Sequence, residues 1–493
     1  MNACQKSRIA NRKSQSTLDL LRAYESRNVT FFERDGSWPI VWERARDVYV
    51  WDAEGKKYLD LTAAFGVAAT GHANSRVVSA GQKQMGRLLH AMGDVHPHAL
   101  KARLARELSR ITFERWANKS KVQGPKSKVA ETQAEVKGPK SGKVIFCNSG
   151  FEAVEAALKT GMLATGKAGV IAFEGAYHGL GYGALNATHR SHFRSPFRQQ
   201  LREFGHFLPF PSVSNGLSSN GSEGGPANQN ASPVRTAELQ TAIHYLFQRE
   251  RIGAILVEPI QVRGGIHVPP PEFLPMLRDL CDAHGALLIL DEIYTGFGRT
   301  GKWFACEHTG VVPDLICLGK ALTGGFPLSA CVGQRDLMDR AWPPSEGEAI
   351  HTSTFLGHPV GCAMALAQLE EIKRQRLVQR SQQLGEHLLH SLSRLNLQAL
   401  ELNLQSRGRG LLAGVELSHL DGTPATAITL HVVKSLLHRG FVFLPEGEHA
   451  NVIGFTPPLT ISSKQLDSAV FALKDALLAS QTGRSRRKPI AEP

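Results

Sequence analysis

Short apolar runs alternate with helix-like stretches through the middle of the chain. The runs are rich in β-branched residues and each gives way to a polar residue or a glycine; they are KVIFC (143–147), GVIAF (169–173), IGAILV (252–257), ALLIL (286–290) and DLICL (314–318). Such runs are typical of strands buried on both faces, as in a parallel sheet. Helix-like stretches, including 152–165 and 271–283, separate several of them. The pattern predicts an α/β domain with a mainly parallel central sheet and a site at the carboxyl ends of its strands.

The last third of the chain follows a different pattern. A long helix-like stretch over 359–394 precedes a mixture of shorter strand-like and helix-like segments, which lie at 411–417, 425–438, 441–444, 452–456 and 463–479. Elements on this scale predict a second, smaller α+β domain. The strand–turn–strand pattern of 47–61, with its turn at Glu54–Gly55, is expected to join this smaller domain.

The expected organisation is a disordered basic leader (1–27), a segment that joins the small domain (28–65), a large domain (66–350), a small domain (351–480) and a disordered basic tail (481–493). Two segments of the large domain look inserted. Residues 117–143 are rich in Lys, Ser and Gly, and residues 211–235 are almost free of large apolar groups. Neither can bury enough surface to offset the entropy of ordering, so both are expected to be mobile surface loops.

The formal net charge of +13 lies mostly outside the expected folded body. The excess of Lys and Arg falls in residues 1–15, 117–143 and 484–493. The remainder is nearly neutral, which argues against nucleic-acid binding and favours solvated basic tails. A nucleic-acid binder that uses these segments is the alternative, and it predicts an affinity that falls steeply with salt.

The cysteines and the apolar segments bear on the cellular compartment of the protein. The seven cysteines are odd in number and scattered, so neither a disulfide framework nor a zinc or other metal site is indicated. No apolar stretch is long enough to span a bilayer, and the N-terminus lacks the apolar core of a secretion signal. We therefore expect a cytoplasmic protein without membrane contact.

The first candidate for chemistry lies where the strand 143–147 ends, in NSGFEAVEAALK. Ser149 is expected to cap the following helix, with Glu152 completing a capping box. Gly150 permits close approach of a ligand, and the free N–H groups of the helix would form an anion site suited to a phosphate. A well-capped helix without a ligand is the alternative.

Two more polar groups follow buried strands. Asp291 stands after the strand 286–290, where an ionised carboxylate is costly unless it meets a cation such as a protonated ring nitrogen. Lys320 stands after the strand 314–318, and burial there would lower the pKa of its amine and make it a nucleophile towards carbonyls. Taken singly, each could be a cap or an ion-pair partner. An anion site, an acid and an amine at neighbouring strand ends indicate one shared ligand.

A series of motifs follows along the chain: WDAEGKKYLDL, FCNSGFEAVEAALK, FEGAYHG, VEPIQ, LILDEIYTGFGRTG, PDLICLGKAL, HTSTFLGHP and RGRGLLAGVEL. In this order they resemble the class III aminotransferases, a fold-type-I family of enzymes that use pyridoxal 5′-phosphate (PLP). The resemblance covers residues 28–480 apart from the two inserts. It implies transfer of an amino group from an amino acid or carboxylate-bearing amine to a 2-oxo acid.

The resemblance implies a cofactor site in residues of these motifs. Ser149, Gly150 and the backbone of Phe151 would bind the PLP phosphate. Tyr177 would stack on the pyridine ring, and His178 of the same motif would also contact the cofactor. Phe151 stands where the family commonly has Thr, which removes one hydroxyl but keeps the backbone donors.

The resemblance also assigns the reacting groups. Asp291 would keep the ring nitrogen protonated, and Lys320 would hold PLP as a Schiff base and then shuttle a proton. Tyr294 replaces a frequent Gln near the phenolic oxygen of the cofactor, where its hydroxyl could still donate. Thr354 would reach the phosphate of a second subunit, which implies a homodimer.

Two arginines are the candidates for substrate binding. The resemblance implies that Arg407 binds a substrate carboxylate through its fork. Arg263 stands where many members of the family carry Glu, and it is expected to favour an anionic substrate, with a second carboxylate as one possibility. An Arg263 side chain that points to solvent is the alternative.

Other reactions would use the same cofactor and the same site residues. Aminomutases, racemases, decarboxylases and phospho-lyases use the same cofactor and break different bonds of the substrate. A non-catalytic binding protein is a further alternative, although Lys320 and Asp291 are both present. Transamination is the default expectation, and a requirement for a 2-oxo acid as co-substrate would distinguish it.

Overall fold

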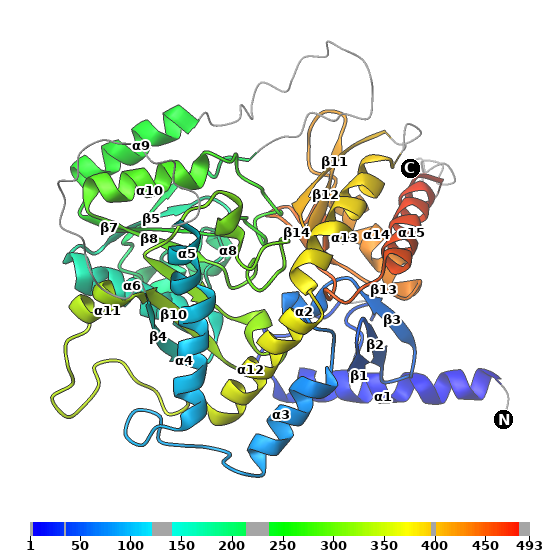
Figure 1. Ribbon diagram of the computed structural model, residues 1–493. Helices are drawn as coiled ribbons and strands as arrows, with labels where there is room; N and C mark the ends of the chain where they lie inside the picture. Colours follow the sequence, from blue (N-terminus) through cyan, green and yellow to red (C-terminus); the bar gives the residue numbers. More distant parts are fainter. Residues whose placement is uncertain (1–2, 34–35, 121–140, 213–235, 396–400, 483–493) are drawn as a thin grey trace.

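The computed structural model describes residues 3–33, 36–120, 141–212, 236–395 and 401–482. A central sheet organises the larger part of the chain (Figure 1). Its seven strands lie in the order β4 (Gly142–Cys147), β10 (Ser329–Gln334), β9 (Leu315–Leu318), β8 (Leu287–Asp291), β7 (Ile252–Val257), β5 (Gly169–Phe173) and β6 (Gly205–Leu208). Only β10 pairs antiparallel with its neighbours, so the prediction of a mainly parallel sheet is confirmed.

Helices cover both faces of this sheet. Since successive side chains of a strand point to opposite faces, each strand packs against helices on two sides. On β7, Leu256 packs with α6 (Gly150–Thr165) and α11 (Arg335–Ala341), whereas Ile255 packs on the opposite side. The opposite side is covered by α4 (Ala99–Ile111), α9 (Thr236–Arg249) and α10 (Phe273–His284). The unbroken apolar runs of the sequence are thus explained by burial on two sides.

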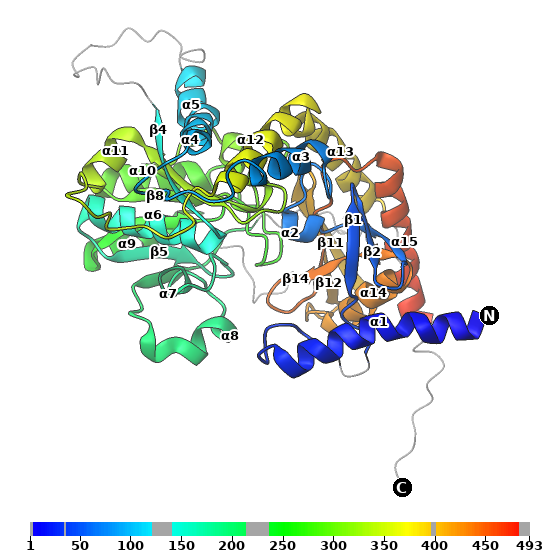
Figure 2. The same cartoon turned by 90° about the horizontal axis from the view of Figure 1, so that it is seen from below.

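Two smaller sheets lie beside the large one (Figures 1 and 2). One has the order β11 (Leu402–Arg409), β12 (Leu412–His419), β15 (Val452–Phe455) and β14 (Leu444–Glu446). Three helices accompany it: α13 (Leu377–Ser393), α14 (Thr426–His438) and α15 (Ser463–Thr482). The other has the order β1 (Trp42–Arg46), β2 (Tyr49–Asp52), β3 (Lys57–Asp60) and β13 (Phe441–Val442). The parallel pairing of β3 with β13 joins the N-terminal strands to the C-terminal part of the chain.

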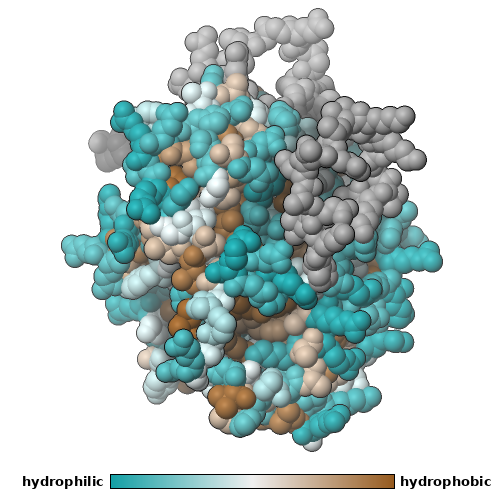
Figure 3. Space-filling view, turned by 60° about the vertical axis from the view of Figure 1, so that its left-hand side comes forward, coloured by the Kyte–Doolittle hydropathy of each residue, from teal (hydrophilic) through white to brown (hydrophobic). Residues whose placement is uncertain are grey.

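The remaining helices and turns complete the description. The helices are α2 (Ala63–Gly66), α3 (Ser75–Met85), α5 (Phe113–Ser120), α7 (Tyr182–Leu185), α8 (Ser191–Arg194) and α12 (Pro359–Arg374), with 3-10 turns at Ser195–Gln200, Ala305–His308 and Lys320–Leu322. Within the described ranges, no helix has the length and apolar character that crossing a membrane requires. The face in Figure 3 is largely hydrophilic, with apolar side chains gathered towards a hollow near its centre.

The structure corrects two expectations, one about the leader and one about the long helix-like stretch 359–394. The leader 1–27 is not disordered throughout, because α1 spans Ala3–Tyr24. Its Leu18 is buried, and the hydroxyl of Ser14 donates to the Glu54 carboxylate at 2.6 Å. The stretch 359–394 is two helices instead of one, because Arg376 between α12 and α13 has a left-handed backbone (φ 53°).

The expected inserts are narrower than the sequence indicates. Helix α5 extends to Ser120 and β4 begins at Gly142, so both edges of 117–143 are regular structure. The rest of that segment, 121–140, lies outside the described residues. The same holds for 213–235 of the second insert and for 483–493 of the basic tail.

Candidate active site

A cavity of about 460 Å³ opens where the parallel strands end. Its walls come from the segments that follow β4, β5, β7, β8 and β9, and are formed by Gly150, Phe151, Tyr177, His178, Gly179, Leu180, Glu258, Arg263, Asp291, Ile293, Tyr294 and Lys320. Segments far apart in the sequence meet here because the carboxyl ends of parallel strands share one edge of a sheet. The structure therefore brings most of the predicted site residues together.

The start of α6 forms one end of the cavity. Ser149 is the N-cap residue, but its side chain makes no cap hydrogen bond, and its buried Oγ has no partner among the described residues. Glu152 accepts instead from the backbone N of Asn148 at 2.8 Å, so the expected capping box is not formed. A Cβ on Gly150 would lie 3.1 Å from Cδ1 of Ile293, which explains the glycine. A free hydroxyl beside free helix N–H groups is suited to an anion.

Asp291 and His178 form a buried pair on the cavity wall. The two atoms Oδ2 of Asp291 and Nδ1 of His178 are 2.8 Å apart. The backbone N of Ile293 donates to Oδ1 of Asp291 at 3.1 Å. Nε2 of His178 is buried and has no partner among the described residues. These contacts fix the orientation of the carboxylate towards the cavity.

Lys320 follows β9 with a left-handed backbone (φ 41°). Its Nζ lies 4.6 Å from the centroid of the Tyr294 ring. Burial lowers the pKa of the Lys320 amine, whereas the nearby carboxylates of Asp291 and Glu258 oppose this shift. A larger neutral fraction of the amine increases its reactivity as a nucleophile and base.

Tyr294 closes another side of the cavity. Its hydroxyl lies 3.3 Å from Oγ1 of Thr456, so the phenol already has a partner in the small-domain sheet region. Its ring packs against Gly66, where an added Cβ would lie 2.9 Å from Cε1 of Tyr294. The N-terminal segment and the C-terminal segment therefore both hold this ring in place.

Glu258 is a site residue that sequence reasoning missed. It follows β7 directly, as Asp291 ends β8, and it accepts hydrogen bonds from the backbone N of Tyr177 (3.1 Å) and of Val262 (3.3 Å). Burial raises the pKa of Glu258 to about 7, with Asp291 adding to the rise and His178 opposing it. A carboxylate directly after a buried strand was the signal available in the sequence.

The raised pKa of Glu258 predicts a pH-dependent stability difference. A carboxyl whose pKa rises from 4.5 to about 7 on folding stabilises the folded state below the lower value, and loses that contribution as the pH rises through the higher one. In protein freed of cofactor, Glu258→Gln should therefore exceed the wild type in free energy of unfolding at about pH 8, by on the order of 2–3 kcal/mol, and match it near pH 4.5. Denaturant unfolding at both pH values measures this. An equal difference at both would contradict the assignment.

Arg263 lines the cavity and is surrounded by charged groups. Its Nε lies 3.6 Å from Oε2 of Glu446, and its guanidinium lies 5.8 Å from the centroid of the Tyr177 ring. Its backbone carbonyl accepts from Nη2 of Arg190 at 2.5 Å. Arg263 therefore belongs to the cavity and does not point only to solvent. Sequence reasoning missed Glu446 and Arg190 as its charged neighbours, because both lie far from it along the chain.

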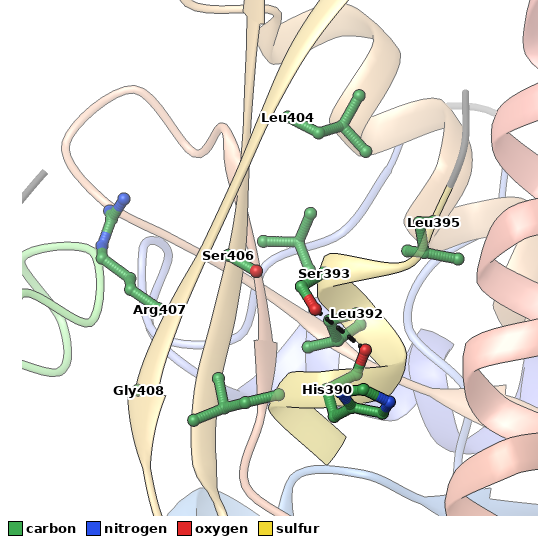
Figure 4. Close-up of a pocket in the computed structure, with 10 residues that line it drawn as sticks. His390, Leu392, Ser393, Leu395, Leu404, Ser406, Arg407 and Gly408 are labelled. Carbon is green, nitrogen blue, oxygen red and sulfur yellow. Dashed lines mark hydrogen bonds between the residues drawn. The ribbon is translucent and has the colours of Figure 1, made fainter. Parts of the chain in front are cut away.

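Arg407, in contrast, is not brought into the cavity. Its guanidinium donates to the carbonyls of Gly265 (2.6 Å) and Ile266 (3.0 Å) and to Glu416 (2.5 Å). Figure 4 shows its side chain leaving β11 on the side opposite to a separate cavity of about 270 Å³ beside α13. In this arrangement Arg407 is engaged by protein groups, and its binding of a substrate carboxylate stays a prediction.

Thr354 also lies outside the cavity of its own chain. It is exposed, and the neighbouring Ser353 accepts a hydrogen bond from Nδ2 of Asn148 at 3.4 Å. Because Asn148 precedes Ser149, this surface segment lies close to the anion end of the cavity.

Comparison with known proteins agrees with this geometry. The family model for aminotransferase class-III matches residues 31–477. An acetylornithine aminotransferase of Methanosarcina mazei is 34% identical over 441 residues, which are 90% of this chain and 92% of that protein. A 5-aminovalerate aminotransferase of Pseudomonas aeruginosa is 34% identical over 443 residues, which are 89% and 93% of the two chains.

Solved structures show the same architecture. The ornithine aminotransferase of Toxoplasma gondii, with PLP at partial occupancy in its active site, is 25% identical, with a TM-score of 0.77 over 99% of this chain and 100% of that one. An aminotransferase of Bacillus anthracis is also 25% identical, with a TM-score of 0.78 over 97% of this chain and 100% of that one. The likeness extends over nearly the whole of this chain.

Proposed function

The chain belongs to the class III aminotransferases, and on this premise we propose which of its residues carry out PLP-dependent transamination. The reaction moves an amino group from an amine or amino acid to a 2-oxo acid. One observation carries the assignment of roles: the amine of Lys320, the carboxylate of Asp291 and the start of α6 lie around a single cavity.

The residues of the cavity fit PLP. The unpartnered hydroxyl of Ser149 and the N–H groups at the start of α6 suit its phosphate. The Asp291 carboxylate, oriented by His178, suits a protonated ring nitrogen. Tyr177 and Phe151 supply aromatic surface for the ring and its surroundings. The phosphate, the ring nitrogen and the ring face of the cofactor thus each have a matching group.

Bound PLP supplies an electron sink that stabilises negative charge on the reacting carbon of the substrate. Lys320 would hold the cofactor through its amine and, once displaced by the substrate amine, would carry the proton of that carbon to the cofactor carbon at which the amine had been attached. Asp291 holds a proton at the ring nitrogen, because a nearby carboxylate favours the charged form. The ring of Tyr294 lies 4.6 Å from Nζ of Lys320 and would shield one side of the amine.

The substrate is proposed to carry at least one carboxylate besides its reacting group. The two relatives are named after acetylornithine and 5-aminovalerate, and each of these compounds carries an amine and a carboxylate in the same molecule. Arg263 stands on the cavity wall, where its guanidinium is suited to receive a carboxylate. The site is therefore expected to favour anionic substrates, with an advantage for a second carboxylate.

Absorption spectroscopy tests the proposed function directly. Purified protein with PLP should show a visible cofactor band that amino donors bleach and 2-oxo acids restore. Continued turnover of an amino donor without any 2-oxo acid would instead indicate an aminomutase, racemase, decarboxylase or phospho-lyase. A protein that stays colourless with added PLP would contradict the cofactor assignment.

A homodimer is proposed from apolar surface beside the cavity. The exposed apolar side chains of this surface are Met85, Leu88, Leu89, Met92, Val95, Ile350 and Phe355. Its two segments adjoin, because Oγ1 of Thr352 donates to the Asp94 carboxylate at 2.7 Å. Exposed apolar surface of this kind marks an interface, and a second copy related by twofold symmetry would cover it. Thr354 lies in the same surface and would then reach the phosphate end of the other cavity.

Leu89→Asp should shift the protein from dimer to monomer in sedimentation velocity, because it places a charge in the apolar contact. Affinity for PLP should fall about tenfold, since each cavity would lose a wall. Leu420→Asp is the matched control, because Leu420 is also an exposed leucine (63%, against 59% for Leu89) outside this surface. A monomeric wild type, or a dimer in both variants, would argue against this interface.

We also infer a reducing, cytoplasmic setting. The cysteines of the described residues for which burial is known are all free and buried. Cys317 and Cys331 face each other across β9 and β10 and both remain thiols. A reducing compartment preserves such a pair.

A further inference from the structure

Another cavity, of about 480 Å³, lies apart from the active site. Its walls come from the segments 268–271, 300–308, 382–389 and 407–410, which include part of α13 and the turn between β11 and β12. It shares no described lining residue with the active-site cavity. We call it the basic cavity, after the charges that line it.

Basic side chains dominate the lining of the basic cavity. Lys302 and Arg409 are both exposed, and within the described ranges neither side chain has a hydrogen-bond or ion-pair partner. Arg407 also lines the cavity, but Glu416 offsets its charge. Glu386 is the one acidic residue among the described lining residues. The lining therefore carries more positive than negative charge, and two of its cations are available to bind an anion.

His308, a further lining residue, shows the effect of these cations. Its Nε2 lies 3.0 Å from the carbonyl oxygen of Thr300 and donates to it, since a carbonyl can only accept. Burial and the guanidinium of Arg409 lower the pKa of His308 to about 4, and Lys302 acts in the same direction. The positive charge of both cations thus reaches the inside of the cavity, where a bound anion would offset it.

Close backbone contacts build the frame of the basic cavity. Gly410, in the turn after β11, has a left-handed backbone (φ 56°), and an added Cβ would lie 2.4 Å from the backbone C of Thr300. An added Cβ on Gly385 of α13 would lie 2.2 Å from the carbonyl oxygen of Gly410. The backbone N of Leu411 also donates to the carbonyl of Arg299 at 3.0 Å. Because these segments already hold one another, a ligand would find the cavity formed and would not have to order it.

Apolar side chains complete the lining. They are Val268, Pro269, Pro271 and Leu389. The volume of about 480 Å³ is close to the 460 Å³ of the active-site cavity, so an inorganic ion alone would fill only a small part of it. A ligand that uses the whole lining needs a charged end and an apolar body.

We propose that the basic cavity is a binding site for an organic phosphate. Lys302 and Arg409 bind its phosphate group, and its apolar body lies against Pro269, Pro271 and Leu389. A dianionic phosphate matches two cations, and a guanidinium can donate to two of its oxygens at once. A single carboxylate would leave one cation without a partner. The site goes beyond the proposed transamination, because it uses none of the residues that line the active-site cavity.

Phenyl phosphate is a suitable probe, since it joins an apolar ring to a phosphate that is mostly dianionic at about pH 7.5. Loading the protein with PLP fills the anion end of the active-site cavity, so calorimetric titration then reports another site. Inorganic phosphate and phenol should each bind at least about tenfold more weakly than phenyl phosphate, because each lacks one half of the probe. The affinity for phenyl phosphate should also fall as the concentration of NaCl rises.

Variants of the lining place the bound phosphate. Lys302→Gln combined with Arg409→Gln should weaken the binding of phenyl phosphate at least about tenfold, because both cations are lost. Glu386→Gln should strengthen it about two- to threefold, because it removes the opposing charge. The matched control combines Lys464→Gln with Arg202→Gln, which removes the same charges from exposed positions outside this lining. It should change the affinity less than twofold.

Equal affinities of the wild type and the Lys302→Gln/Arg409→Gln variant would overturn the proposal. So would a wild type that takes up no phenyl phosphate at about 5 mM, or one that binds inorganic phosphate equally well. Both replaced side chains are exposed, so the double variant should keep the melting temperature of the wild type. Failure of the proposed function appears separately, as a wild type whose cofactor band is not bleached by any amino donor.

Discussion

Lys320→Ala should lose the visible cofactor band and at least about 10³-fold in kcat, because the covalent attachment and the proton-transferring amine disappear together. Its amine lies in the cavity, and burial lowers its pKa, which favours the neutral form that can act as a base. Stopped-flow absorbance with an amino donor measures the rate. Borohydride reduction of the wild type followed by peptide mapping should place the cofactor on the peptide that contains Lys320.

Lys143→Ala is the control for this prediction. Lys143 lies on β4 and forms an exposed ion pair with Asp339, away from the cavity. Its replacement should leave both the band and the rate unchanged. A Lys320→Ala protein that kept the band and turned over at a rate close to that of the wild type would show that another amine holds PLP.

Asp291→Asn should reduce kcat by about 10³-fold while leaving the fold intact, because the side chain keeps its shape and loses its charge. The ring nitrogen would then lose the carboxylate that favours its protonated form. Asp291 is buried and bonded to His178 and to the backbone N of Ile293, so the amide must also disturb the His178 contact. The rate of bleaching by an amino donor, measured at saturating PLP, separates this effect from weaker cofactor binding.

Asp279→Asn provides the comparison, since Asp279 is exposed on α10. A PLP analogue with a permanent positive charge on the ring nitrogen should restore part of the rate in Asp291→Asn and add nothing to the wild type. Equal rates for Asp291→Asn and the wild type would remove Asp291 from the reaction.

The sheet and much of the site could be predicted because their signals are local in the sequence. Each central strand is a continuous apolar run, since burial on both faces leaves no polar position. Lys320 and Asp291 were found because each closely follows such a run, and strand ends of a parallel sheet gather at one edge. The order of the motifs along the chain then indicated the family.

Local patterns misled where a contact with a distant segment decided the outcome. Helix α1 was expected to be disordered, but Leu18 finds a buried position and Ser14 finds Glu54. The hydroxyl of Ser149 was expected to cap α6, but it is left free while Glu152 bonds to Asn148.

The two arginines illustrate the same limit for function. In the sequence, the resemblance implies that Arg407 binds a substrate carboxylate, and Arg263 is a further candidate. Packing gives them different surroundings, because Glu416 and two carbonyls engage Arg407, whereas Arg263 lies on the cavity wall beside Glu446. The residue types and their positions at strand ends follow from short-range pattern. The partners, the burial and the unused hydrogen-bonding groups of each side chain depend on contacts between segments that lie far apart in the sequence. These contacts exist only in the folded chain.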